Sequence, residues 1–368
     1  MNIVVTGSNG FIARNLLVHL NRMENVKVSG LDRSTDQAKW IKQLDQADVI
    51  FHLAGTNRPP VAEAFLTDNY DLTRFVVDRL ENRNSSYILI FSSSTQASLD
   101  NPYGKSKMEA EDYIRKNTKS GKAVIYRLPG VFGKWCRPNY NSVVATFCYN
   151  TANHLPVQVK DPDFELRLVY IDDIVRSFIG QIQQSGGPTP VIEEKVEPEY
   201  SITLGRLAAT IMSFQNNRNT LFIPNVGDGL EKALYSTWLT YLPSGEFAYD
   251  LELRTDSRGS LFELLKSRSG GQIFISTTLP GITRGNHFHH TKAEKFVVIQ
   301  GSGLIQFRSL LDKNEIEYEV DGSTPQVVDI PPGYVHNITN MGDNTMITLF
   351  WANEVFDPQN TDTFFEKV

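Results

Sequence analysis

GITRGNHFHHTKAEKFVVIQG, residues 281–301, carries His287, His289 and His290 within four positions, followed by Glu294. A further histidine, His336, lies downstream within PPGYVHNITN. His287 and His289 alternate along an expected strand, so both side chains point to one face of it. Three imidazoles and one carboxylate form a donor set that suits zinc, manganese, iron or nickel. The stretch therefore predicts a metal site in a β-rich region.

His290 breaks this alternation. It could replace His287 or His289 as a ligand if the strand bulges there, because a bulge changes which side chains face inward. The alternative without a metal is that the histidines face solvent or contact a substrate. The candidate metal ligands are His287, His289, His290, Glu294 and His336, with zinc as the expected ion.

Short strand-like runs surround the histidines and are separated by Gly, Pro, Asn and Asp. They cover residues 271–277, 294–300, 303–309, 315–320, 325–330 and 345–351. Several short strands with turn signals between them are typical of an antiparallel barrel or double-sheet jelly roll. We expect this second domain to begin at residue 247, after the breaker PSG at 243–245.

The N-terminal part follows a different pattern, in which apolar strands alternate with helical stretches. Strands are expected at residues 2–6, 26–31, 49–53, 87–91 and 124–128, and helices at 11–22, 62–82 and 105–119. Such alternation predicts a parallel sheet covered by helices on both faces. The expected fold class is an α/β Rossmann-type domain, residues 1–243, followed by an all-β domain, residues 247–368.

A glycine-rich turn, TGSNGFIA at residues 6–13, follows the first strand and opens the first helix. Gly7 permits the tight turn, and Gly10 lets backbone amides approach a pyrophosphate at the helix N-terminus. Asp32 ends the next strand, where dinucleotide-binding domains hold a ribose hydroxyl. We expect the cofactor to contact Gly7, Asn9, Gly10, Phe11, Ile12, Arg14, Asp32, Arg33, Leu53, Ala54, Gly55, Tyr103 and Lys107.

Charged residues near this turn bear on the choice between the two nicotinamide cofactors. Asp32 favours NAD, because a carboxylate repels a 2′-phosphate. Arg33 beside it, and Arg14 at the start of the helix, could bind that phosphate. We expect NADPH, with NADH as the alternative.

Tyr103 and Lys107 form a YxxxK pair, and their four-residue spacing places both on one face of a helix. A lysine ammonium near the phenol would lower its pKa and make it a usable general acid. FSSS at residues 91–94 precedes the pair, and a serine hydroxyl there could hold a substrate oxygen.

Together these motifs resemble the extended short-chain dehydrogenase/reductase family of nucleotide-sugar enzymes. The matching pieces are TGSNGFIA, HLAG at 52–55, FSSS, YGKSK at 103–107, RLPGVFG at 127–133 and LVYIDDIV at 168–175. The resemblance implies catalysis by Ser94, Tyr103 and Lys107. Only eight residues separate Ser94 from Tyr103, fewer than in many relatives, so the pocket wall is expected to be reshaped or supplied by other segments. Arg167 is a candidate for the substrate diphosphate, or else forms a surface salt bridge.

The C-terminal part resembles the cupin superfamily. Gly281, HxH at 287–289, Glu294 and Gly301 match its first motif, and PxGxxHxxxN at 331–340 matches the second, except that Pro325 replaces a leading glycine. The resemblance implies a barrel whose metal ligands are His287, His289, Glu294 and His336. The acid and base for chemistry there could come from the histidines, Lys292 or Tyr334.

The composition excludes several function classes. The net charge of -6 and the pI of about 5.7 leave no basic excess to attract nucleic acid or anionic lipid. The spacing of Cys136 and Cys148 fits neither a disulfide framework nor a cysteine-based zinc site. No apolar run approaches the roughly 20 residues of a membrane helix, and the N-terminus begins with a strand pattern rather than a signal peptide. We expect a cytoplasmic enzyme, and both resemblances imply a homodimer.

The domain order and both motif sets resemble bifunctional enzymes of capsular polysaccharide synthesis. The resemblance implies that the cupin domain epimerises a UDP-4-keto-6-deoxy-N-acetylhexosamine at C3. NADPH-dependent reduction at C4 would then give UDP-2-acetamido-2,6-dideoxy-L-talose, on the route to UDP-N-acetyl-L-fucosamine. One alternative is a reductase whose cupin is a structural or dimerising metal-binding module. Another is a cofactor-sensing regulator, which would not need an activated phenol.

Overall fold

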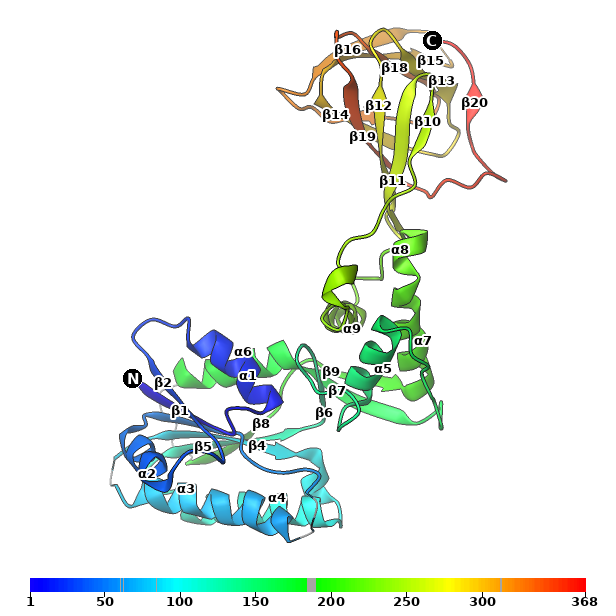
Figure 1. The fold of residues 1–368 in the computed structure, drawn as a ribbon. Coiled ribbons are helices and arrows are strands. Elements are labelled where there is room, and N and C mark those ends of the chain that lie inside the picture. The colour runs from blue at the N-terminus through cyan, green and yellow to red at the C-terminus, as the bar shows by residue number, and fades with distance from the viewer. Residues whose placement is uncertain (60, 62, 84, 184–189, 312) are drawn as a thin grey trace. The chain divides into compact units, whose positions relative to one another are not determined.

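The computed structural model of the chain describes residues 1–59, 61, 63–83, 85–183, 190–311 and 313–368 (Figure 1). The chain forms two compact units. The first comprises Met1–Met212 and Ala233–Leu242, and the second comprises Ser213–Lys232 and Pro243–Val368. The second unit thus takes in residues 213–232 as well as the C-terminal part with the strand pattern.

The first unit is built on a six-stranded parallel sheet with the order β2-β1-β3-β4-β5-β8. Its strands are β1 (Asn2–Thr6), β2 (Lys27–Leu31), β3 (Val49–His52), β4 (Ile88–Ser94), β5 (Lys122–Leu128) and β8 (Val191–Glu194). The chain order reverses between β1 and β3. Doubly wound sheets bind ligands outside the carboxyl ends of the strands at such a point.

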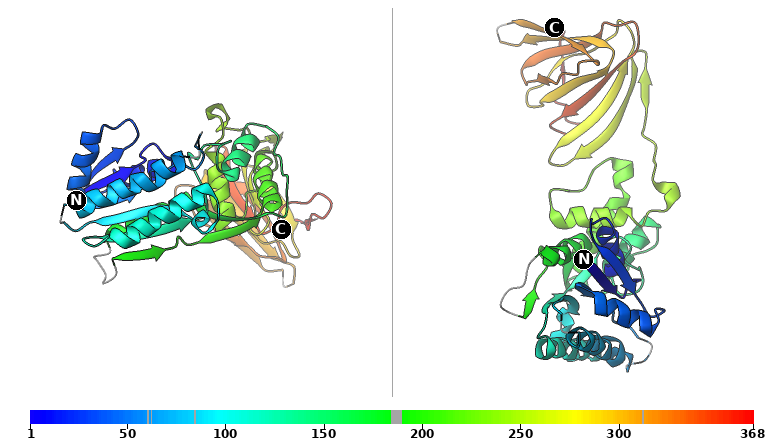
Figure 2. Two further views of the ribbon diagram at one scale, coloured as in Figure 1. Left: turned by 90° about the horizontal axis from the view of Figure 1, so that it is seen from below. Right: turned by 90° about the vertical axis from the view of Figure 1, so that its left-hand side faces the viewer.

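Helices cover both faces of this sheet (Figure 1, Figure 2). One face carries α1 (Phe11–Leu20) and α6 (Ile171–Gln183), and the other carries α2 (Gln37–Gln46), α3 (Leu72–Glu81) and α4 (Pro102–Asn117). Ile3 and Val5 of β1 belong to the first core and Val4 to the second. Because successive side chains enter opposite cores, each strand reads as a continuous apolar run. The expected Rossmann-type α/β fold is confirmed.

Smaller elements complete the first unit. They are η1 (Leu66–Asp71), a π-helix in the stretch expected as one helix, η2 (Thr95–Ser98) and α5 (Val143–Ala152), with a three-stranded sheet of β6 (Gly130–Phe132), β7 (Glu165–Tyr170) and β9 (Glu199–Thr203). The helices α7 (Leu204–Gln215) and α9 (Gly229–Leu239) cross the boundary between the units, and most of each lies in the first. The indole of Trp238 on α9 donates to Thr151 on α5 at 3.1 Å. Among the described helices, none is long and apolar enough to cross a membrane.

The second unit contains two antiparallel sheets, with the orders β10-β11-β12-β19-β14-β17 and β16-β15-β18-β13-β20. The strands of the first sheet are β10 (Arg254–Asp256), β11 (Gly259–Ser267), β12 (Gly271–Thr278), β14 (Glu294–Gln300), β17 (Val328–Ile330) and β19 (Met346–Ala352). Those of the second are β13 (Thr283–Phe288), β15 (Ser302–Ser309), β16 (Glu315–Asp321), β18 (Tyr334–Asn340) and β20 (Phe364–Phe365).

The core of this unit lies between the two sheets. Its buried side chains come from both, and they are Phe296, Val298, Ile305, Phe307, Val320, Val328, Ile330, Ile338, Met346 and Phe350. Burial alternates residue by residue along β15 and β19, as expected for strands with one face in a core. The expected all-β, double-sheet fold of the C-terminal part is confirmed.

Residues 213–232 belong to the second unit through backbone contacts with β11. The amide of Ile223 donates to the carbonyl of Lys266 at 2.8 Å, and the amide of Lys266 donates to the carbonyl of Leu221 at 2.8 Å. Arg218 of α8 (Asn217–Thr220) donates to the carbonyl of Glu246 in the short helix η3 (Ser244–Glu246). These bonds join segments that the strand pattern alone does not connect.

Candidate functional site

Two adjoining cavities lie at the carboxyl ends of the parallel strands in the first unit. One has a volume of about 690 Å³ and the other about 650 Å³. Gly7, Asn9, Gly10, Leu53 and Gly55 line both cavities. Every residue that the sequence predicts to contact the cofactor lines at least one of them. The position agrees with the switch point of the sheet between β1 and β3.

The glycine-rich turn has the geometry that a pyrophosphate needs. Gly7 has φ +66°, and a Cβ placed on it would lie 2.8 Å from the Cα of Ala54. Only glycine fits this combination of left-handed backbone and close approach. Gly10 caps α1 without a side chain, and the first turn of α1 has no acidic residue. The amides of that turn can therefore receive an anion, so this part of the site fits a dinucleotide.

Asp32 and Arg33 both line the 650 Å³ cavity, and their charged groups have different partners. The carboxylate of Asp32 accepts bonds from Asn9 Nδ2 at 2.5 Å and from the amide and hydroxyl of Ser34 at 2.8 and 2.6 Å. Arg33 forms an ion pair with Asp68 at 2.5 Å, and its side chain is 81% exposed. Much of the acceptor capacity of Asp32 is thus used locally, whereas the Arg33 guanidinium borders the cavity.

A buried polar chain, which the sequence did not reveal, fixes the strand ends beneath the cavities. His52 at the end of β3 contacts Thr6 Oγ1 at 2.8 Å and Thr73 Oγ1 at 2.9 Å. The amides of Leu53 and Ala54 donate to the same Thr6 hydroxyl at 3.2 and 3.1 Å. Burial, with a smaller contribution from the charge of Lys107, lowers the pKa of His52 to about 3. His52 is therefore neutral at physiological pH and acts as a structural bridge.

The three predicted catalytic residues line the 690 Å³ cavity together. Ser94 is the last residue of β4, and Tyr103 and Lys107 lie in the first two turns of α4. Asn101 caps α4 by accepting from the amide of Gly104 at 2.8 Å, and Pro102 occupies a first-turn position where its missing N–H costs nothing. The cap therefore sets where α4 begins and how Tyr103 enters the cavity.

The expected effect of Lys107 on Tyr103 is not what the structure shows. Burial raises the pKa of Tyr103, and a hydrogen bond with Ser94 only partly opposes this. The ammonium of Lys107 donates to the carbonyl of Ser92 at 3.0 Å and lies 5.0 Å from the centre of the Phe91 ring. Burial also lowers the pKa of Lys107 to about 8. The prediction of a lowered phenol pKa was wrong, because burial raises the pKa of Tyr103.

Asn69, in the π-helix η1, is a positioning residue that the sequence motifs did not indicate. It is 1% exposed, and it exchanges two hydrogen bonds with the backbone of Thr56, at 2.9 and 3.1 Å. Its amide also donates to Ser106 Oγ on α4 at 2.9 Å. π-Helical turns are frequent at functional sites. Here the turn links the loop after β3 to the helix that carries Tyr103 and Lys107.

Residues 128–142 supply the wall that the short Ser94–Tyr103 connection leaves to other segments. Trp135, Arg137, Tyr140 and Ser142 line the 690 Å³ cavity, and the Arg137 guanidinium lies 5.4 Å from the Tyr140 ring centre. Arg167 instead pairs with Glu199 at 3.2 Å, and its side chain is 75% exposed. Arg167 thus forms the surface salt bridge that was its alternative interpretation. Within residues 128–142, Arg137 is the arginine that lines the cavity.

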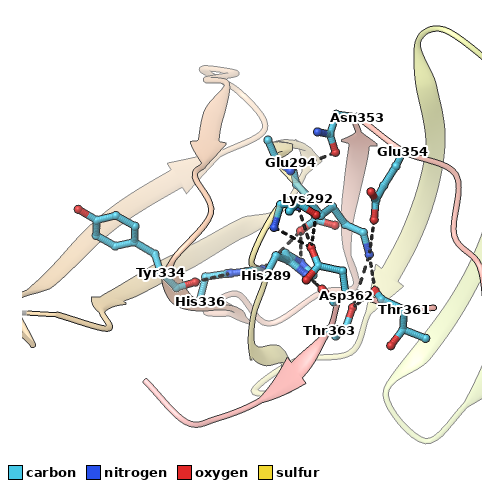
Figure 3. A network of polar contacts seen from close by, with 12 residues as sticks. His289, Lys292, Glu294, Tyr334, His336, Asn353, Glu354, Thr361, Asp362 and Thr363 are labelled. Atoms are coloured by element: carbon cyan, nitrogen blue, oxygen red, sulfur yellow. Dashed lines mark hydrogen bonds and ion pairs between the residues drawn. The ribbon is translucent and has the colours of Figure 1, made fainter.

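In the second unit, four of the five predicted metal ligands gather in one cluster; Figure 3 shows three of them, His289, Glu294 and His336. His287, His289, Glu294 and His336 each offer a ligand atom, and these atoms lie within 4.8 Å of one another. His287 lies in β13, and His289 is the first residue after that strand. Glu294 begins β14, and His336 lies in β18. The cluster therefore draws ligands from both sheets of the barrel.

The hydrogen bonds of two histidines bear on whether this cluster could hold a metal ion. Nδ1 of His289 lies 2.6 Å from the carbonyl oxygen of Asp362, and Nδ1 of His336 lies 3.2 Å from that of Tyr334. A carbonyl only accepts, so each Nδ1 carries a proton, and in the neutral ring this leaves Nε2 with the lone pair that can bind a metal. Both Nε2 atoms face Glu294 Oε2, at 3.3 and 3.4 Å, and Nε2 of His336 is buried without a hydrogen-bond partner. Converging lone pairs of this kind fit a divalent metal.

Electrostatics support the same arrangement. Burial tends to raise the pKa of Glu294, but the neighbouring His289 and His336 outweigh it and hold the pKa at about 2. Burial and the neighbouring histidines lower the pKa of His287 to about 4. A carboxylate that stays ionised and an imidazole that stays neutral are the protonation states in which these side chains bind a metal.

His290 lies outside the cluster, which corrects its inclusion among the predicted ligands. The register shift in β13 falls between Gly285 and His287, before the histidines rather than at His290. The chain turns after Phe288, and the exposed His290 packs against Phe288 and Phe364, with ring centroids 5.3 and 4.8 Å away. The early bulge leaves His287 and His289 as the inward pair.

The structure also separates the other acid–base candidates. The ammonium of Lys292 donates to the carbonyl of Thr361 at 2.9 Å and lies 3.8 Å from Glu354. Tyr334 points away from the other labelled side chains (Figure 3). Neither side chain therefore joins the four ligands, and His290 is likewise directed elsewhere.

Comparisons with known proteins match the N-terminal and C-terminal parts of the chain to two different families. Residues 3–192 match the NAD dependent epimerase/dehydratase family, and residues 254–364 match the polysaccharide biosynthesis C-terminal domain. The chain is 41% identical over 366 residues to a UDP-2-acetamido-2,6-beta-L-arabino-hexul-4-ose reductase of Pseudomonas aeruginosa, covering 99% of this chain and 98% of that protein.

Solved structures show the same likeness. The capsular polysaccharide assembling protein CapF from Staphylococcus aureus is 42% identical, with full coverage of both chains and a TM-score of 0.90. A UDP-glucuronic acid 4-epimerase from Bacillus cereus shares the fold of 66% of the chain, at 16% identity and a TM-score of 0.56. The chain therefore belongs to the NAD dependent epimerase/dehydratase family and, within it, to the group of two-domain proteins that includes CapF.

Proposed function

We propose that this protein is a bifunctional nucleotide-sugar enzyme. The second unit epimerises C3 of a UDP-4-keto-6-deoxy-N-acetylhexosamine, and the first unit then reduces C4 with NADPH to give UDP-2-acetamido-2,6-dideoxy-L-talose. The observation that carries the proposal is that one chain holds both a Ser94–Tyr103–Lys107 site beside a dinucleotide cavity and a closed three-histidine, one-glutamate cluster. The keto-sugar reductase name of the Pseudomonas relative supports the reduction.

The order of the two steps follows from the chemistry of the ketone. A carbonyl at C4 acidifies the proton on C3, so a base can remove it and an acid can return it on the opposite face. Reduction of the carbonyl ends this acidity. Epimerisation must therefore come first. A divalent metal, for which we propose zinc, would supply Lewis acidity toward the developing oxyanion when bound by His287, His289, Glu294 and His336.

In the reduction, a bound nicotinamide supplies the hydride that goes to C4. The hydroxyl of Tyr103 donates the proton to the C4 oxygen, and Ser94 hydrogen-bonds the same oxygen. Burial raises the pKa of Tyr103, so the phenol is protonated at neutral pH and ready to act as the acid. Lys107, held by the Ser92 carbonyl, places a positive charge behind this group.

NADPH is the proposed cofactor because of the charges around its expected ribose. Arg33 borders the cavity as an exposed guanidinium paired with Asp68, and its other N–H groups can still reach a phosphate, whereas the Asp32 carboxylate accepts from Asn9 and Ser34. An arginine fork matches a 2′-phosphate in geometry and charge. We also expect the enzyme to act as a homodimer, which sedimentation analysis would test.

The decisive experiment is proton NMR of the full-length, zinc-loaded enzyme with the 4-keto sugar nucleotide in deuterated water, without NADPH. We expect deuterium to enter C3 while the ketone persists. Addition of NADPH should then yield the reduced sugar. If C3 stays protonated while NADPH still gives a reduced product, the enzyme is a reductase alone and the cluster has a structural role.

A further inference from the structure

The last residues of the described chain lie beside the strand that carries the histidines. β20 pairs with β13, with Phe365 opposite His287 and Phe364 opposite Phe288. The rings of Phe288 and Phe364 stack with centroids 5.3 Å apart, and the amide of Glu366 donates to the carbonyl of Asn286 at 3.0 Å. We call residues 357–366 the C-terminal segment.

Asp362 ties this segment to the turn that follows β13 (Figure 3). Its carboxylate accepts from the amide of His290 at 3.0 Å and from the amides of Thr291 and Lys292, both at 2.8 Å. The hydroxyl of Thr291 adds a fourth bond at 2.9 Å. A turn between two strands would otherwise leave these amides to solvent. A single side chain therefore sets the shape of residues 290–292.

The backbone of the same residue contacts the metal-site cluster. The carbonyl oxygen of Asp362 lies 2.6 Å from Nδ1 of His289, which directs Nε2 toward Glu294. His289 is 3% exposed, so its ring has little room to choose another partner. Asp362 has φ +38°, a left-handed conformation that aspartate adopts more readily than most residues. In this conformation the carbonyl of Asp362 reaches His289, and its carboxylate accepts from the amides of residues 290–292.

Lys292 supplies a second attachment. It is 6% exposed, and its ammonium donates to the carbonyl of Thr361 at 2.9 Å, next to Asp362. Glu354 lies 3.8 Å from the same ammonium. The segment is thus held from both sides of the point where it meets His289.

We propose that Asp362 is a positioning residue for the cluster, through which the C-terminal segment fixes the tautomer and orientation of His289. The inference rests on the proposed function in one respect, namely that the cluster binds a metal. Outer partners of ligating histidines fix the tautomer, and their loss lowers metal affinity by roughly 10–100-fold. Ligand spacing alone assigns no such role to a residue 73 positions away from His289.

The test uses the full-length protein and Asp362→Gly, which keeps the left-handed backbone but removes the carboxylate. Asp362→Asn is the milder second variant. Asp357→Asn is the matched control, because Asp357 lies in the same segment, is exposed and accepts from the amide of Gln359 at 2.9 Å. Zinc affinity is measured by competition with a chromophoric chelator, and ligand geometry by the visible spectrum of the cobalt-substituted protein.

We expect Asp362→Gly to weaken zinc binding by about 10–100-fold and to shift the cobalt bands, with a smaller loss for Asp362→Asn and none for Asp357→Asn. A cooperative urea unfolding transition of the second unit in each variant would show that the unit carrying the cluster is folded. Unchanged zinc affinity and cobalt spectrum in Asp362→Gly would overturn the proposal, even if the melting temperature fell. A wild-type protein that takes up neither metal would overturn the metal site itself.

Discussion

The two sites differ in how they are built. The site in the first unit lies in open cavities at strand ends, and most of its groups are backbone amides and side chains from motifs within residues 6–142. The cluster in the second unit is closed, and it depends on side chains from β13, β14 and β18 and on a carbonyl from the C-terminal segment. An elongated cofactor requires a groove, whereas a metal requires a few lone pairs that converge on one point. The two units are therefore expected to respond independently to substitution.

The largest expected effect is on the reduction alone. Tyr103→Phe removes the proton donor, and we expect the rate of ketone reduction to fall by about 100- to 10,000-fold. Deuterium exchange at C3 should continue at the wild-type rate, because the cluster is untouched. Stopped-flow loss of NADPH absorbance and proton NMR measure the two activities.

The matched control for this variant is Tyr113→Phe on the same helix. Tyr113 bonds Asp78 at 2.5 Å on an exposed face and lines neither cavity. It should reduce the ketone normally. Normal reduction by Tyr103→Phe would contradict the catalytic assignment and favour a cofactor-sensing role.

Glu294→Gln is expected to have the opposite effect, namely loss of C3 exchange with reduction retained. The neutral amide weakens the donor set, and we expect zinc affinity and C3 exchange to fall by about 100-fold or more, since loss of an outer partner of a ligand already costs roughly 10–100-fold. Reduction of a ketone that is already epimerised should be unchanged. His290→Ala is the control, because His290 lies outside the cluster. Loss of zinc from His290→Ala would show that the cluster uses His290 after all.

A smaller effect is expected within the first unit from Arg33→Ala. Loss of a charged hydrogen bond to the 2′-phosphate, about 1.5–3 kcal/mol, should raise the KM for NADPH by roughly 10-fold or more. The KM for NADH should change little, since NADH lacks that phosphate. Lys39→Ala, an exposed change on α2, serves as the control. An equal rise for both cofactors would sink the assignment of Arg33 to the phosphate.

The smallest effect concerns stability, and it should be confined to the first unit. The pKa of His52 is about 3 in the fold, below its ordinary value near 6.5. As pH falls, the imidazole of His52 is therefore protonated at a higher pH in the unfolded chain than in the folded protein. Stability from His52 is complete above pH 6.5 and declines toward pH 3, with a slope of at most about 1.4 kcal/mol per pH unit.

Urea unfolding monitored separately for the two units, between pH 7 and 5, would measure this slope. His52→Asn should be less stable at pH 7 but should show a flatter dependence on pH. The unfolding of the second unit should be unaffected by the substitution. An equally steep slope in the variant would mean that another group causes the acid sensitivity.

Periodic patterns predicted much of the architecture. The strand runs expected at 271–277, 294–300 and 303–309 correspond to β12, β14 and β15, and the helix expected at 105–119 corresponds to α4. These elements bury one or two faces, so their burial leaves a regular trace in the sequence. Residues 221–223, by contrast, join β11 through isolated backbone bonds that impose no pattern on side chains. The sequence pattern therefore did not predict this contact.

The sequence by itself indicated the dinucleotide turn at Gly7, the Tyr103–Lys107 pair and five candidate metal ligands, four of which form the cluster, because motifs of this kind depend on residue type at characteristic spacing. Tertiary structure decided what surrounds them. It placed His290 outside the cluster, put Arg137 rather than Arg167 in the cavity wall, and raised the pKa of Tyr103 by burial. It also brought the carbonyl of Asp362 to His289. Burial and hydrogen bonds between distant loops depend on where the chain returns in space, and local spacing carries no record of that.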